Sequence, residues 1–314
     1  MKETEVLVFH SHGVGQAIKL NEFPLNGETV WSNSWEIGTD AAKGSNVAIA
    51  LSRLGIKTAF AGRIGTDIWG KFALEMLQKE NLDLSSLIQD KSFNTMIGIV
   101  LVNDDGSNSI ILGGDNAAFT SSEIENIFNQ HSNASYVVTG FEIDIHSALT
   151  IAKLASSKGK KVILNASPIP EEDPGEMPFV DILVLNENEA IALSNNSNGS
   201  FMEIARQLQD KFSVTNIVLT LGSKGCLILK DNIFFNIPSW PTSLIVDTSG
   251  AGDSFLAAMI AFLIRGYTLE DACGLGTVYA SDTISKRGTI TAFATFNEMK
   301  SQFCKYKGSQ ILQF

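Results

Sequence analysis

A glycine-rich turn that ends in a carboxylate stands near the C-terminal end of the chain, in the run Asp247-Thr248-Ser249-Gly250-Ala251-Gly252-Asp253. Residues 255–264 are mostly apolar and predict a buried helix directly after it. The two glycines let the three amides of residues 250–252 converge on an anion, and the positive end of the helix adds to that field. An anion site does not need Asp253, so we interpret this carboxylate as a general base. A base beside an anion site is the arrangement that phosphorylation of an alcohol requires.

A second polar element follows residues 182–185, which predict a buried strand. Asn186 and Glu189 are three residues apart and would share one face at the start of a helix. They could form an ordinary helix cap. They could instead hold Mg²⁺-phosphate through water, because Mg²⁺ keeps several waters and takes few protein carboxylates. The carboxyl end of a strand is where open α/β sheets place ligands, and together with the glycine-rich turn this favours the second interpretation.

Two further segments have both a plain and a functional interpretation. Residues 220–225, Thr220-Leu221-Gly222-Ser223-Lys224-Gly225, predict a tight turn between two strands. Thr220 and Gly222 could also face nucleotide phosphates or ribose, since glycine permits close approach. Residues 41–46, Ala41-Ala42-Lys43-Gly44-Ser45-Asn46, are either a packing corner of small residues or the place where the backbone and Asn46 meet a polyol.

Short apolar segments alternate with helical patterns along the chain, which predicts a parallel sheet covered on both faces. The predicted strands span residues 6–9, 58–61, 136–138, 161–164, 182–185, 217–221 and 226–229. The predicted helices span residues 46–54, 69–80, 147–158, 201–211 and 254–265. We expect one domain over residues 1–314, because the alternation has no long linker.

Residues 20–37 and 93–112 break this alternation. They are rich in β-forming residues and carry the turn signals Asn26-Gly27 and Asp104-Asp105-Gly106, so they predict antiparallel hairpins. Together with the residues that flank them, 13–37 and 93–115, they would form a small sheet set apart from the parallel core. Such a sheet could act as a lid over a site at the carboxyl ends of the core strands.

Composition excludes several classes of protein. The chain has 314 residues, of which 44% are hydrophobic and 18% charged, and its net charge is −11. This balance argues against nucleic acid or an anionic membrane as a partner. Three cysteines at scattered positions predict free thiols in a reducing compartment. No segment is long and apolar enough for a signal peptide or a membrane span, so we expect a soluble cytoplasmic protein.

The four polar segments, in this order and spacing, resemble those of the ribokinase-like (PfkB) carbohydrate kinase family. The resemblance extends from Val6 to about Phe296, and the Asp-Thr-x-Gly-Ala-Gly-Asp motif is highly specific. It implies a three-layer α/β/α fold with a mainly parallel central sheet and a β-sheet lid, often used for dimerisation. It also implies roles for individual residues: Asp253 as catalytic base, the amides of Gly250, Ala251 and Gly252 as anion hole, Asn186 and Glu189 on Mg²⁺ and phosphate, and Thr220, Gly222, Ser223 and Gly225 on the nucleotide.

The match is weaker at the sugar site. Family members carry Gly-Gly-Lys-Gly-Ala-Asn where this chain has residues 41–46, and an Asn-x-Asp element where this chain has Gly13 and Gly15. A lost carboxylate removes a charge-assisted hydrogen bond of roughly 1.5–3 kcal/mol, which corresponds to ten- to hundredfold weaker ribose binding. Asp40 could replace it. The expected acceptor-binding residues are Gly15, Asp40, Ala42, Lys43, Asn46, Glu142 and Asp253.

The resemblance predicts an ATP-dependent kinase that phosphorylates a primary hydroxyl of a sugar or sugar-like molecule with Mg²⁺. The alternatives are a kinase for a nucleoside or a sugar acid, or a ligand sensor that has lost catalysis. Asp247 and the segment Lys286-Arg287-Gly288 fit the family's monovalent-cation site, although Ala292 stands where ribokinase has Ser, so K⁺ activation is left open. Trp31 and Trp35 alternate with polar residues in the predicted lid, which predicts lid packing or a homodimer interface.

Overall fold

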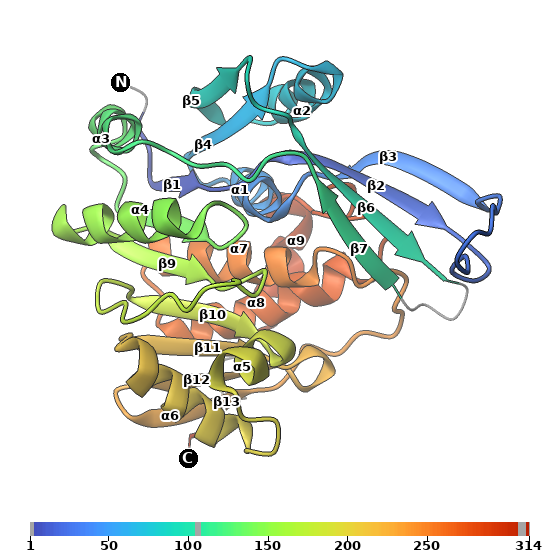
Figure 1. Ribbon diagram of the computed structural model, residues 1–314. Helices are drawn as coiled ribbons and strands as arrows, with labels where there is room; N and C mark the ends of the chain where they lie inside the picture. The colour runs from blue at the N-terminus through green and yellow to red at the C-terminus, as the bar shows by residue number, and fades with distance from the viewer. Residues whose placement is uncertain (1–2, 104–107, 307–311, 314) are drawn as a thin grey trace.

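The computed structural model describes residues 3–103, 108–306 and 312–313 (Figure 1). Within these residues the strands form one sheet of ten and one sheet of four. In the large sheet the order is β14-β13-β12-β11-β10-β9-β8-β1-β4-β5. The strands from β11 to β5 are parallel to one another, whereas the pairs β11–β12, β12–β13 and β13–β14 are antiparallel. Their bounds are β1 (Val6–Phe9), β4 (Thr58–Gly65), β5 (Asp83–Asp90), β8 (Tyr136–Gly140), β9 (Lys161–Asn165), β10 (Ile182–Asn186), β11 (Asn216–Thr220), β12 (Cys226–Lys230), β13 (Ile233–Ile237) and β14 (Leu312–Gln313).

Helices cover both faces of the large sheet, so the core has three layers (Figure 1). One layer consists of α1 (Lys43–Arg53), α2 (Ile68–Gln78), α7 (Ala251–Ile264), α8 (Leu269–Thr283) and α9 (Phe296–Phe303). The other consists of α3 (Ser121–Gln130), α4 (Ile145–Ser157), α5 (Glu187–Ser194) and α6 (Phe201–Phe212). Strand residues alternate between the two layers: Val6 and Val8 pack with the first, Leu7 and Phe9 with the second. This explains why a central strand such as β1 is apolar throughout.

Helix α7, which follows the glycine-rich turn, is buried over most of its length. Every residue from Asp253 to Phe262 is buried, and the small side chains of Ala257, Ala258 and Ala261 let α1 and α8 pack closely against it. The N-terminus of α7 is therefore held rigidly at the carboxyl-end edge of the sheet. No helix in the described part of the chain is long and apolar enough to cross a membrane.

The four-stranded sheet extends from one side of the core (Figure 1). Its order is β3 (Ser34–Asp40), β2 (Gly13–Lys19), β6 (Met96–Val102) and β7 (Asn108–Gly113). The pairs β2–β3 and β6–β7 are antiparallel, whereas the central pair β2–β6 is parallel. We call this sheet the lid.

The fold prediction was right in class and wrong in one detail of the lid. The predicted core strands and helices are present, with the helices α1 and α7 beginning three residues earlier than expected. The hairpin predicted over residues 20–37 was misplaced: its first strand is β2, before residue 20, and residues 20–33 form no strand. Asn26-Gly27 does turn the chain, but inside this connection. The hairpin predicted over 93–112 is confirmed as β6–β7, while its turn signal at 104–106 lies outside the described residues.

Candidate active site

The polar segments identified in the sequence come together at the carboxyl ends of the parallel strands. His10 follows β1, Glu142 follows β8, and Asn186 ends β10. The N-terminus of α7, with Asp253 in its first turn, reaches the same edge, because Asn46 near the start of α1 donates to the Asp253 carboxylate across 207 residues of sequence. Open α/β sheets bind ligands at this edge.

The turn before α7 has the backbone shape of an anion site. Gly250 caps the helix in the left-handed region at φ 72°, and a Cβ there would lie 2.4 Å from Thr289 Cγ2, so only glycine fits. A Cβ on Gly252 would meet nothing within 4 Å, which leaves open space beside its amide. The Ala251 amide makes a long bond of 3.3 Å to the Thr248 carbonyl. The amides at the start of this 14-residue helix lack intrahelical partners and suit a phosphate.

Asp253 has the surroundings of a general base. Its side chain is buried, and its Oδ2 accepts a hydrogen bond of 2.8 Å from Asn46 Nδ2. Burial raises the pKa of Asp253, and the neighbouring charge of Asp40 raises it further, while Lys43 and the bond from Asn46 act in the opposite direction. A raised pKa makes the carboxylate a stronger proton acceptor than an exposed aspartate.

The positively charged side chain of Lys43 interacts with four acidic groups of this site. Burial acts to lower its pKa, but the combined attraction of four carboxylates outweighs burial and raises it, so the ammonium stays charged. These carboxylates belong to Asp253, Glu142, Glu189 and Asp40. The structure thus brings together residues that the sequence spreads over more than two hundred positions.

Glu142 belongs to a buried hydrogen-bonded chain that also includes two residues the sequence analysis did not select. Its Oε2 accepts from the Lys43 amide at 2.8 Å and from the Ser11 hydroxyl at 2.5 Å, and the Ser11 amide donates to His10 Nδ1 at 2.8 Å. Burial raises the pKa of Glu142 to about 7 and lowers that of His10 to about 3. His10 is therefore a neutral imidazole whose Nε2 carries the proton and has no partner in the described residues. The sequence signal that could have identified His10 and Ser11 is their position directly after the first core strand.

The start of α1 is strained where the substrate is expected. Ala42, its N-cap, has φ 75° and ψ 157°, a region that is essentially restricted to glycine. Just before it, Asp40 Oδ1 accepts from Asn46 Nδ2 at 2.6 Å. Asp40 is paired with Gly15 across the β2–β3 ladder, and a Cβ on Gly15 would lie 2.5 Å from Asp40 Cβ. The two positions therefore cannot both carry side chains in this geometry.

Asn186 and Glu189 form a reciprocal capping box at the start of α5, which is the plain interpretation of this pair. The Asn186 side chain accepts from the Glu189 amide at 2.9 Å, and Glu189 Oε2 accepts from the Asn186 amide at 2.8 Å. Glu189 keeps its other oxygen and is buried near Lys43 and Asp253. No group of three or more His, Cys, Asp or Glu side chains among the described residues could hold a metal. This donor set suits a Mg²⁺ ion that is bound largely by phosphate and water.

The expected nucleotide-binding residues lie at the end of β11 and in the short 3₁₀ turn of residues 222–224. Thr220 Oγ1 donates to the Leu185 carbonyl at 3.3 Å, and a Cβ on Gly222, at φ 54°, would have no neighbour within 4 Å. Ser223 is exposed. Gly225 has a structural reason for its identity, because a Cβ there would lie 2.0 Å from the Ile237 carbonyl oxygen.

Asp247 connects the glycine-rich turn to the segment at 286–292. Its Oδ1 accepts from the Ser249 amide and its Oδ2 from the Gly288 amide, both at 2.9 Å. The next residues of that segment reach the lid: the amides of Thr289 and Ile290 donate to the Thr39 carbonyl at 3.1 and 3.0 Å. The same segment therefore contacts both the turn and lid strand β3.

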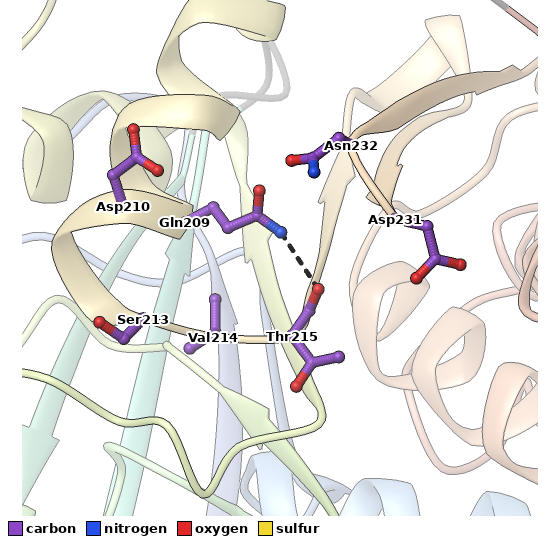
Figure 2. A pocket seen from close by; sticks show the side chains of 7 residues that line it. All are labelled: Gln209, Asp210, Ser213, Val214, Thr215, Asp231 and Asn232. Carbon is purple, nitrogen blue, oxygen red and sulfur yellow. Dashed lines mark hydrogen bonds between the residues drawn. The ribbon is translucent and has the colours of Figure 1, made fainter.

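An open groove lies at the opposite edge of the large sheet, around the loop that leads into β11 and the turn between β12 and β13 (Figure 2). Gln209 Nε2 donates to the Thr215 carbonyl at 3.1 Å within it. None of the residues predicted to do chemistry lines this groove. Its lining residues are Gln209, Asp210, Ser213, Val214, Thr215, Asp231 and Asn232.

Comparison with known sequences agrees with the geometry. Residues 41–295 match the model of the pfkB family of carbohydrate kinases. The chain is 28% identical over 299 residues to a ribokinase of Staphylococcus aureus, an alignment that covers 94% of this chain and 98% of that protein.

Solved structures share the fold. A ribokinase from Giardia lamblia superposes with a TM-score of 0.88 at 20% identity, covering 98% of this chain and all of that one. A ribokinase from Arabidopsis thaliana, complexed with ribose and ATP, superposes with a TM-score of 0.83 at 23% identity, covering 97% of this chain and 99% of that one. At these identities the likeness establishes the ribokinase-like α/β fold.

Proposed function

This chain belongs to the PfkB family of carbohydrate kinases, phosphotransferases with an alcohol as acceptor, and we propose that it transfers the γ-phosphate of ATP to a primary hydroxyl of a sugar or sugar-like molecule. The observation that carries the proposal is the buried Asp253 carboxylate in the first turn of α7, beside the open amide of Gly252. We take the chain as one kinase domain, residues 1–314, with a lid formed by 13–37 and 93–115.

In the proposed reaction, Asp253 accepts the proton of the acceptor hydroxyl, and that hydroxyl attacks the γ-phosphorus in line. The amides of Gly250, Ala251 and Gly252, with the helix dipole of α7, stabilise charge on the transferred phosphoryl group. The raised pKa of Asp253 favours proton acceptance. Closure of the lid would exclude water from this step.

ATP, Mg²⁺ and K⁺ are assigned to separate parts of the site. We assign Thr220, Gly222, Ser223 and Gly225 to the nucleotide and Asn186 with Glu189 to Mg²⁺-phosphate, where the ion would offset the charge of the phosphates. Asp247 is the candidate ligand for K⁺. Free carboxylate lone pairs remain for both ions, since each oxygen of Asp247 and one oxygen of Glu189 accept a single amide bond from the residues that the structure describes.

The acceptor is assigned to the residues at the start of α1 and near the Ser11–Glu142 chain. They offer amide, ammonium and carboxylate groups to a polyol, and the set is Gly15, Asp40, Ala42, Lys43, Asn46, Glu142 and Asp253. Three free cysteines fit a reducing compartment, so we place the reaction in the cytoplasm. We also propose a homodimer through the lid, where large apolar side chains of β3, β7 and the β2–β3 connection are exposed: Trp31, Trp35, Ile110 and Leu112.

The test is ADP release by the wild type and by Asp253→Asn. With Mg²⁺-ATP and a panel of pentoses, hexoses, sugar acids and nucleosides, we expect release with at least one neutral sugar. The variant should lose turnover by several orders of magnitude while it still binds ATP, because the amide cannot accept the proton. Near-normal turnover of the variant would remove Asp253 from the base role. Release with no compound of the panel would favour a ligand sensor.

A further inference from the structure

Asp40 and the base Asp253 are linked by one amide group. Asn46 Nδ2 donates to Asp40 Oδ1 at 2.6 Å and to Asp253 Oδ2 at 2.8 Å, so both of its protons are used. The assignment of nitrogen and oxygen follows from a third bond, in which Asn46 Oδ1 accepts from the Ala41 amide at 3.1 Å. The plane of the Asn46 amide is therefore determined by three partners.

We propose that Asp40 is a positioning residue for phosphoryl transfer: through the shared amide of Asn46 it fixes the orientation of the Asp253 carboxylate. The inference rests on the proposed role of Asp253 as the base. Asp40 suits this task because it stands where three elements meet. It ends β3 of the lid and precedes α1, and its neighbour Thr39 accepts hydrogen bonds from the amides of Thr289 and Ile290 in the segment 286–292.

Gly15 is part of the same arrangement. Its place opposite Asp40 in the β2–β3 ladder leaves no room for a second side chain, since a Cβ would lie 2.5 Å from Asp40 Cβ and 2.9 Å from the Asp40 carbonyl oxygen. The carboxylate at this corner of the site can thus come from β3 or from β2, but not from both. In this chain the carboxylate is that of Asp40 on β3, which the Asn46 amide links to Asp253.

Asp40 also acts on Asp253 through its charge. The charged groups that face Asp253 are Asp40 from β3, Lys43 from α1, Glu142 from the loop after β8 and Glu189 from α5. Of these, Asp40 and Glu189 raise the pKa of Asp253 and Lys43 lowers it. Loss of the Asp40 charge alone should therefore make Asp253 a weaker base.

Two variants distinguish the effect of the Asp40 charge from its effect on the orientation of the Asp253 carboxylate. Asp40→Asn keeps an oxygen that can accept from Asn46 but removes the charge, and Asp40→Ala removes both. In ¹³C-aspartate-labelled protein, with Asp253→Asn used to assign the signal, we expect Asp40→Asn to lower the pKa of Asp253 by about one unit. Asp40→Ala should in addition lower kcat by roughly ten- to hundredfold, with KM for ATP changed less than about twofold.

Glu270→Gln is the matched control, because Glu270 is another buried carboxylate that accepts a bond, from Lys230 Nζ at 2.9 Å, away from the site. It should lower stability and leave the Asp253 titration unchanged. An unchanged Asp253 pKa in Asp40→Asn, or an equal loss of kcat in Glu270→Gln and Asp40→Ala, would overturn the proposal. The titration needs no turnover, so it stays informative even if full activity of Asp253→Asn overturns the base role itself.

Discussion

Replacement of Glu142 by glutamine should change how the stability of the protein depends on pH. Glutamine has nearly the same shape, and its Oε1 can still accept from the Ser11 hydroxyl and the Lys43 amide, which now donate to Glu142 Oε2. What the substitution removes is the ability to ionise. Burial raises the pKa of Glu142 to about 7 from an ordinary value of 4.5.

The direction and size of this pH effect follow from the linkage between proton binding and folding. The folded state holds the proton of Glu142 more tightly than the unfolded chain, so the neutral acid contributes stability that is fully present below pH 4.5 and is lost as pH rises through 7. A shift of this size corresponds to about 3 kcal/mol. The unfolding free energy of the wild type minus that of Glu142→Gln should therefore fall by about 3 kcal/mol between pH 4.5 and 8.

Urea unfolding of both proteins at pH 4.5, 6, 7 and 8 measures this difference, because ionisable groups away from Glu142 contribute equally to the two and cancel. Parallel curves of unfolding free energy against pH would contradict this prediction, since Glu142 would then have the same pKa in the folded and unfolded states. A difference that rises with pH would show that Lys43 holds the carboxylate ionised.

The strained backbone and the lid give the remaining predictions. Ala42→Gly should raise the free energy of unfolding, measured by urea denaturation, by about 1 kcal/mol. The reason is that the backbone strain of alanine at φ 75° and ψ 157° exceeds the extra chain entropy that glycine loses on folding. A lower free energy of unfolding in the variant would mean that Ala42 is not strained. Ile110→Lys, in the exposed face of the lid, should convert a dimer to a monomer in sedimentation equilibrium, whereas Ile68→Lys, at an exposed position on α2, should not. A monomeric wild type would contradict the lid interface.

Much of the core could be predicted because its signals are local. A run such as 182–185 is apolar throughout since both faces of the strand are buried, and helices α4 and α6 follow the apolar periodicity of their own residues. The lid was harder. Its strand β2 is flanked by β3 and β6, and the choice of partner is made by pairing between segments some eighty residues apart, which no local pattern records.

The same distinction between local and long-range signals applies to the candidate site. Sequence alone identified the turn from Gly250 to Asp253, because glycine conformation and a helix start are properties of adjacent residues. It could not find the link from Asp40 through Asn46 to Asp253, nor the chain from His10 through Ser11 to Glu142. Those contacts join strand ends that only the packed sheet brings to one edge, and burial at that edge raises the pKa values of Asp40, Glu142 and Asp253. The reaction type was readable in a local motif, whereas the tertiary structure decided how Asp253, the proposed base, is held and how its pKa is shifted.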